Sequence, residues 1–106
     1  MSYEVGKVYM MRTLGTEVDY LYLGKTNGGV QYFLRMYDGY VTSYPPRRYT
    51  DVLNIEEYAK RWPNYVKSLS FPDNKLLLNS NHLDLLPALT QIRRRLKLHQ
   101  VLESTE

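Results

Sequence analysis

The residue types that perform catalysis or bind metals are few and scattered in this chain of 106 residues. His82 and His99 are the only histidines and there is no cysteine, so neither histidine has a neighbour at the spacing of zinc ligands. The eleven acidic residues are dispersed, and the chain lacks a P-loop, a G-x-G-x-x-G loop and a recognisable Ser/His/Asp order. The sequence therefore predicts a protein that is not an enzyme and that uses no metal or cofactor.

Positive charge is concentrated in one run near the end of the chain. Residues 93–97 supply four cations with no acid among them. Arg93, Arg94 and Lys97 fall on one flank of the helix expected there, where they suit a phosphate backbone or an acidic protein surface. Four phosphate contacts would give a salt slope of roughly −3.6 on duplex DNA. The alternative is a solvated helix face whose cations complement the helix dipole.

A second basic site follows the Pro-Pro step at residues 45–46. Arg47 and Arg48 stand there between Tyr44 and Tyr49. A Pro-Pro step keeps the chain extended, so both guanidinium groups are expected to project from a loop. Arginine interleaved with tyrosine can neutralise a nucleic-acid backbone and stack on its bases. The alternative is an ordinary exposed connection between strands.

Tyrosine is unusually frequent, with eleven residues against two Phe and one Trp, and nine of the eleven lie within the first 49 residues. An apolar ring with a hydroxyl group suits half-buried sheet surfaces and hydrated binding faces. Five tyrosines could form a stacking platform or a cage for a methylated cation. The alternative is cross-strand packing, worth roughly 0.2–1 kcal/mol for each pair. The five are Tyr20, Tyr22, Tyr37, Tyr40 and Tyr44.

The elements that must position these side chains are strands in the first half of the chain. Period-two alternation and β-prone residues, separated by turn sequences at Asn27-Gly28-Gly29 and Asp38-Gly39, predict about five short strands. In the third, we expect the alternate residues Val30, Tyr32, Leu34 and Met36 to face the core, with Phe33 and Arg35 on the other side. The expected strands are residues 5–12, 18–25, 30–37, 40–44 and 49–53.

Two segments of this half carry a resemblance to a known class of small domain. The opening Val5-Gly6-Lys7-Val8-Tyr9 and the strand end Tyr20-x-Tyr22-Leu23-Gly24-Lys25, followed by successive hairpins, resemble an SH3-like small barrel of the Tudor or KOW type. The resemblance covers roughly residues 3–54, about half of the chain. It implies a binding module for nucleic acid or peptides rather than an enzyme.

The second half is predicted to be helical. Asn54, with Glu57 three residues later, predicts the capped start of a short helix over residues 55–62. Asp84 is the expected N-cap of a final amphipathic helix. Residues 75–78 leave an edge strand and a helix start equally open. The apolar stripe expected on the final helix comprises Leu85, Ala88, Leu89, Ile92, Leu96 and His99.

We therefore expect a single α+β domain over residues 1–106. A small antiparallel SH3-like barrel or meander (3–54) would be followed by a helical extension (55–106) packed on it. The net charge of +3 and pI of about 9.1 permit contact with phosphates without requiring it. No signal peptide or membrane span is expected, and the lack of cysteine favours the cytoplasm.

Two functions fit this sequence. The first is a non-enzymatic module that binds nucleic acid, RNA or DNA, with low sequence specificity. The second is a small adaptor or inhibitor of another protein, because tyrosine and arginine are also enriched at protein interfaces. In general character the chain is similar to phage and mobile-element proteins that disable host proteins. Leu98, Val101 and Leu102 lie off the main stripe and favour this second function, including a homodimer through the C-terminal helix.

Overall fold

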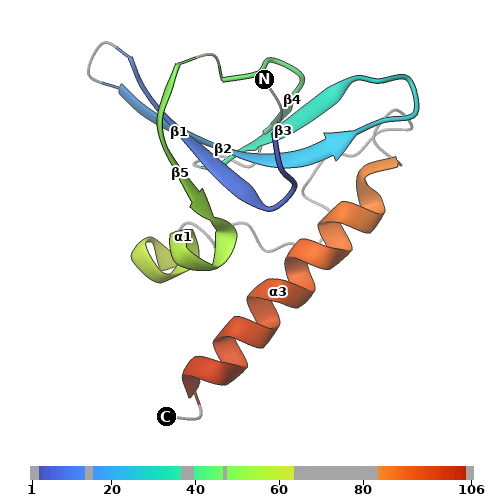
Figure 1. The fold of residues 1–106 in the computed structure, drawn as a ribbon. Helices are drawn as coiled ribbons and strands as arrows, with labels where there is room; N and C mark the ends of the chain where they lie inside the picture. Colours follow the sequence, from blue (N-terminus) through green and yellow to red (C-terminus); the bar gives the residue numbers. More distant parts are fainter. Residues whose placement is uncertain (1–2, 14–15, 37–39, 47, 64–83, 105–106) are drawn as a thin grey trace.

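The computed structural model describes residues 3–13, 16–36, 40–46, 48–63 and 84–104. Within them, five strands precede two helices, which confirms the expected α+β class (Figure 1). In chain order the elements are β1 (Lys7–Thr13), β2 (Thr16–Lys25), β3 (Gln31–Arg35), β4 (Val41–Thr42), β5 (Tyr49–Asn54), α1 (Ile55–Arg61) and α3 (Leu86–Ser104).

The strands form one antiparallel sheet in the order β4-β3-β2-β1-β5. The first four follow one another as a meander, and β5 returns along the free side of β1. β4 and β5 are therefore the two edges, and the sheet does not close. Of the two forms expected from the sequence, a barrel or a meander, the structure has the open meander.

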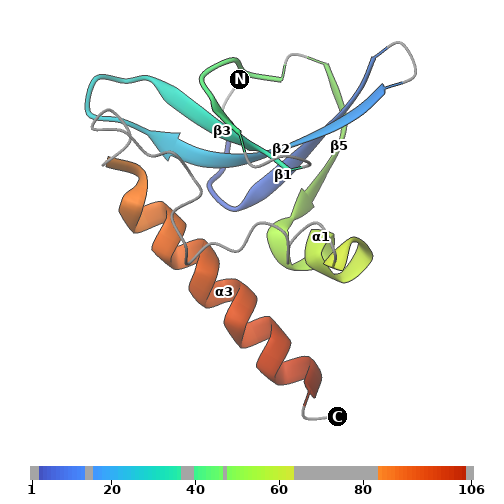
Figure 2. The same ribbon diagram turned by 180° about the vertical axis from the view of Figure 1, so that it is seen from behind.

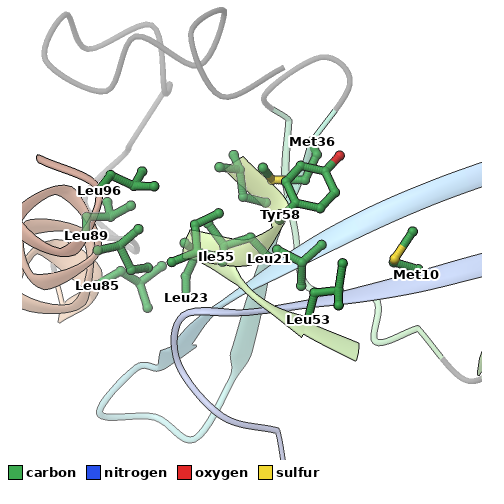
Figure 3. Packing of buried hydrophobic residues seen from close by; sticks show 13 residues of the cluster. Met10, Leu21, Leu23, Met36, Leu53, Ile55, Tyr58, Leu85, Leu89 and Leu96 are labelled. Atoms are coloured by element: carbon green, nitrogen blue, oxygen red, sulfur yellow. The ribbon is translucent and has the colours of Figure 1, made fainter. Parts of the chain in front are cut away.

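Both helices cover the same face of the sheet (Figures 1 and 2). Because side chains alternate along a strand, one set from each strand points toward the helices. The apolar stripe predicted for the final helix supplies the other side of this core: Leu85, immediately before α3, and Leu89, Ile92 and Leu96 within it are buried, whereas Ala88 and His99 are partly buried. In Figure 3 it faces Leu23 of the sheet. The whole helix-side core comprises Val8, Met10, Leu21, Leu23, Leu34, Met36, Leu53, Ile55, Tyr58, Leu85, Leu89, Ile92 and Leu96.

The opposite face of the sheet carries a second core, which is aromatic. Tyr9, Tyr22 and Phe33 are buried there, and Tyr3 packs edge-on against Tyr9 and Phe33 at centroid distances of 5.0 and 4.9 Å. The Tyr3 hydroxyl also donates a hydrogen bond of 3.1 Å to the carbonyl oxygen of Pro46. The chain before β1 and the segment between β4 and β5 thus close over these rings, on the side of the sheet away from the helices (Figure 1).

This second core corrects one expectation about β3. Leu34 and Met36 are buried in the helix-side core as expected, but Phe33, on the other side of the strand, is fully buried as well. Val30, expected among the core residues, precedes β3 and is 43% exposed. Alternation in the sequence assigns residues to one side or the other; it does not show that both sides are covered.

The two residues expected to cap helices, Asn54 and Asp84, each differ from the expectation. Asn54 occupies the N-cap position of α1, but its side chain makes no capping hydrogen bond. The Asp84 carboxylate accepts hydrogen bonds from the backbone N–H of Asn27 (2.8 Å) and from its Nδ2 (3.4 Å). It therefore links the chain just before α3 to the turn between β2 and β3. α3 begins at Leu86, so Asp84 stands one residue farther from the helix than the N-cap position expected for it.

The helices and the start of the sheet meet at an ion pair. The Arg95 guanidinium on α3 lies 2.7 Å from a carboxylate oxygen of Glu56 on α1. Gly6 packs directly on this guanidinium: its φ is +86°, and a Cβ there would clash with Arg95 Nη1. The Gly6 carbonyl also accepts a 2.8 Å hydrogen bond from the backbone N–H of Ile55. One arginine thus joins three separate parts of the chain.

The described residues do not include several features considered in the sequence. The Asp38-Gly39 turn, residues 75–78 and His82 lie outside them. The same is true of Tyr37 and Arg47 among the candidate binding residues.

Candidate functional site

The helix-free face of the sheet has an open part beside its aromatic core. Tyr20 on β2 pairs with Arg35 on β3, and both share this face with Tyr22 and Phe33 because strand side chains alternate. The Arg35 backbone N–H donates a 2.8 Å hydrogen bond to the carbonyl oxygen of Tyr40. Its guanidinium carbon lies 5.1 Å from the centroid of the Tyr40 ring, which is a cation–π contact. We call Tyr20, Arg35, Tyr40 and Tyr44 the tyrosine–arginine surface.

Two tyrosines of this surface are exposed to an unusual degree. Tyr40 is 60% exposed, and Tyr44 is 81% exposed, the highest value for any large hydrophobic side chain in the described part of the chain. They flank β4, a two-residue strand that pairs with Phe33 and Leu34 of β3. The backbone N–H of Tyr44 then donates to Thr42 Oγ1 (3.2 Å). The short edge strand and this local hydrogen bond leave both rings outside the aromatic core.

Two predicted binding residues belong to the aromatic core instead. Tyr22 is only 5% exposed, and burial, followed by repulsion from the Tyr9 hydroxyl, raises its pKa. Tyr49 is partly buried, with its ring 5.0 Å from that of Tyr9. The expectation that all five tyrosines share one accessible platform is therefore wrong for Tyr22, because the residues before β1 cover it. Tyr20 is partly buried at the border between the core and the surface.

The predicted cations divide between the two sides of the sheet. Arg48 is exposed in the segment between β4 and β5. Arg94 and Lys97 are exposed on α3, which covers the opposite face of the sheet, and Arg93 is partly buried (Figure 2). A small ligand that contacts Tyr40 therefore does not reach the cations of α3. From the residue types alone, the basic run on α3 and the exposed tyrosines could belong to one binding site. In the structure they lie on two separate surfaces.

Sequence reasoning did not identify Arg35 as a candidate binding residue, and it did not predict the partners of Arg95. Arg35 is a single cation within a predicted strand, so no run of charge identifies it in the sequence. In the structure it pairs with Tyr20 across the strands and its guanidinium contacts the Tyr40 ring, which places it in the tyrosine–arginine surface. Arg95, part of the basic run, is held by Glu56 and Gly6 instead of facing a ligand. No local sequence pattern predicts these contacts, because Gly6, Glu56 and Arg95 are far apart in sequence.

Among the described residues, no three His, Asp or Glu side chains lie close enough together to hold a metal ion. No helix in this part of the chain has the length and apolar character needed to span a membrane. Comparison with known proteins finds no matching family model, no matching curated protein and no matching solved structure. The function must therefore be argued from the surface itself.

Proposed function

We propose that this protein is a non-enzymatic module that binds nucleic acid with low sequence specificity through the tyrosine–arginine surface. The observation that carries the proposal is the pair formed by Arg35 and Tyr40, together with the exposed ring of Tyr44. Exposed aromatic rings beside guanidinium groups offer a base a stacking partner and a phosphate a counter-charge.

Low specificity follows from the kind of contact that this surface offers. Every base has a π-face, so stacking on a tyrosine tolerates any sequence. Arg35 supplies charge within this surface, and Arg48 is exposed four residues after Tyr44; cations that contact phosphates position the backbone without reading bases. The mildly basic net charge of +3 is compatible with such binding. We also propose that the strand-forming half is related to SH3-like barrels and that the protein acts in the cytoplasm.

Fluorescence anisotropy with a labelled oligonucleotide of about 12 nucleotides, within the usual site sizes of single-strand-binding domains, tests this proposal. The variant Arg35→Gln/Arg48→Gln is expected to reduce the slope of log affinity against log salt by roughly 1.4 to 1.8. The matched control, Arg94→Gln/Lys97→Gln, also removes two charges but on the other face of the sheet, so its slope is expected to stay close to that of the parent. An absence of binding at micromolar protein, or equal slopes for the two variants, contradicts the proposal.

One observation favours a second candidate, a protein partner or a second copy bound along α3. Leu98 is 63% exposed on this helix, and it lies one turn from Arg94. An exposed leucine beside a cation suits an acidic protein surface or the same helix of another copy. Light scattering tests the homodimer: a dimeric mass that becomes monomeric in Leu98→Glu supports it, whereas a monomer at all concentrations excludes it.

A further inference from the structure

We infer that α3 docks an acidic helical segment of another protein along the side that faces away from the sheet. This inference develops the second candidate function, and it does not depend on nucleic-acid binding at the tyrosine–arginine surface. It rests on a row of exposed residues, Leu86, Thr90, Arg94 and Leu98, which we call the α3 ridge.

The α3 ridge lies opposite the part of the helix that belongs to the core. Its members are four residues apart, so they follow one another along one side of the helix. Arg94 is two residues from both Ile92 and Leu96, which are buried, and two residues correspond to a rotation of about 200°. The second half of α3 also extends away from the sheet (Figures 1 and 2). A partner can therefore cover the ridge without disturbing the core.

An exposed leucine stands at each end of the α3 ridge. Leu86 is 44% exposed and Leu98 is 63% exposed. They are twelve residues apart, which corresponds to about 18 Å along a helix. Between them, the Thr90 hydroxyl donates a 2.9 Å hydrogen bond to the carbonyl oxygen of Leu86, so this hydroxyl is satisfied within the helix. A straight ridge with an apolar residue at each end fits the groove between two rows of side chains on another helix.

The charge on this side of α3 determines the kind of helix that fits. Arg94 lies within the ridge and Lys97 lies beside it, and both are exposed. From residue 86 to residue 99, the exposed side chains of α3 include these two cations and no acid. A partner helix with acidic residues beside its apolar ones compensates both cations, whereas a neutral or basic helix leaves them without a counter-charge.

Other occupants complement only part of this surface. The phosphates of a nucleic acid would pair with Arg94 and Lys97, but they offer no apolar surface to Leu86 and Leu98. A membrane takes up the apolar face of an amphipathic helix, and in α3 that face is already packed on the sheet and on α1. A second copy would bring the same two cations to the interface. An acidic protein helix complements the leucines and the cations together.

The experiment uses synthetic helical peptides as probes and titration calorimetry as the measurement. The acidic peptide has about 21 residues, with leucine along one face and glutamate on both flanks, and the control peptide carries lysine in place of glutamate. The full chain is expected to bind the acidic peptide at micromolar concentration and the basic peptide at least about tenfold more weakly.

Substitutions in the chain locate the binding. Leu98→Ala and the double variant Arg94→Gln/Lys97→Gln are each expected to weaken binding of the acidic peptide by about 5- to 50-fold. The matched control, Lys60→Gln/Arg61→Gln, removes two exposed charges on α1 and is expected to stay within about twofold of the parent chain. Circular dichroism of each variant confirms folding, which these exposed positions are expected to preserve.

The outcomes that overturn this inference differ from those that overturn the proposed function. No binding of the acidic peptide at about 100 μM, equal binding of the two peptides, or full affinity in both ridge variants contradicts the docking of an acidic helix. A dimer of the chain alone that dissociates in Leu98→Ala, or binding to anionic lipid vesicles that Leu98→Ala abolishes, assigns the ridge to that occupant instead. Nucleic-acid binding stands or falls separately, because its test uses oligonucleotides and Arg35 on the other face of the sheet.

Discussion

The two faces of the sheet are covered by different means, and the difference separates stability from binding. One face is covered by two helices and contributes an aliphatic core in which Leu21, Leu34 and Ile92 are fully buried. The other is covered only in part, by short segments of chain that pack through aromatic rings. Tyr40 and Tyr44, which flank the edge strand β4, are exposed to solvent. A sheet face that is half covered can hold rigid aromatic side chains at its open border.

The first prediction asks whether the aromatic face stabilises the fold as strongly as the helix-covered face. Phe33→Ala is expected to lower the free energy of unfolding by about 3–5 kcal/mol, and Leu34→Ala on the other side of the same strand by about 2–5 kcal/mol. Both side chains are fully buried. Urea denaturation measures the two values. A loss below about 1 kcal/mol for Phe33→Ala would show that the aromatic face adds little to stability.

The second prediction concerns the junction that holds the helices to the sheet. Gly6→Ala places a side chain at a φ of +86° and against the Arg95 guanidinium, so a loss of about 1–2 kcal/mol is expected from the backbone conformation. The Arg95–Glu56 pair is about one-third exposed, so its rupture adds little.

A double-mutant cycle with Arg95→Ala tests the contact between Gly6 and Arg95 directly. Because both substitutions disturb one contact, their losses are expected to add to more than the loss of the double variant. Strict additivity of the two losses would contradict the packing described here.

The third prediction concerns the ionisation of Tyr22 in the aromatic core. Burial, and then the nearby Tyr9, raises the pKa of Tyr22, so the folded state keeps this proton when the unfolded chain loses it at about pH 10. Stability is therefore expected to fall as pH rises above about 10, because the folded state then binds more protons than the unfolded state. Thermal melting between pH 9 and 11 is expected to show a shallower fall in Tyr22→Phe than in the parent chain, and an equally steep fall in both would contradict the prediction.

The fourth prediction has the smallest effect on stability. Tyr44→Ala is expected to change the free energy of unfolding by less than about 0.5 kcal/mol, because the side chain is 81% exposed. Urea denaturation provides the measurement, with Tyr22→Ala as the comparison at a buried position. A large loss for Tyr44→Ala would place this ring among the structural tyrosines and remove it from the binding surface.

The fold was largely predictable because its signals are local. Alternation and turn residues predict the strands, and the spacing of Leu85, Leu89, Ile92 and Leu96 predicts which side of α3 is buried. The fourth strand was predicted to be longer than it is: residues 40–44 were expected, and β4 comprises Val41–Thr42. Pairing depends on the neighbouring strand, and intrinsic strand propensity does not define its limits.

The candidate site was less predictable because it depends on contacts that are distant in sequence. Composition identifies tyrosine as unusual, but only the register places Tyr20 opposite Arg35. Only the residues before β1 explain why Tyr22 is covered while Tyr40 is exposed. Asp84 shows the same limit for a helix: its type favours a cap, yet its oxygens serve Asn27, more than fifty residues earlier.

The helix-covered face also bears on how this chain can be divided. Composition changes near Asn54, where the strands give way to helices, and a fragment ending there would retain all five strands. Such a fragment would nevertheless leave Leu21, Leu23 and Leu34 facing water, because α1 and the α3 stripe supply the other half of their contacts. Its expected fate in dilute solution is self-association, so trimming the chain to its strand-forming half would yield an aggregating fragment instead of a smaller binding domain.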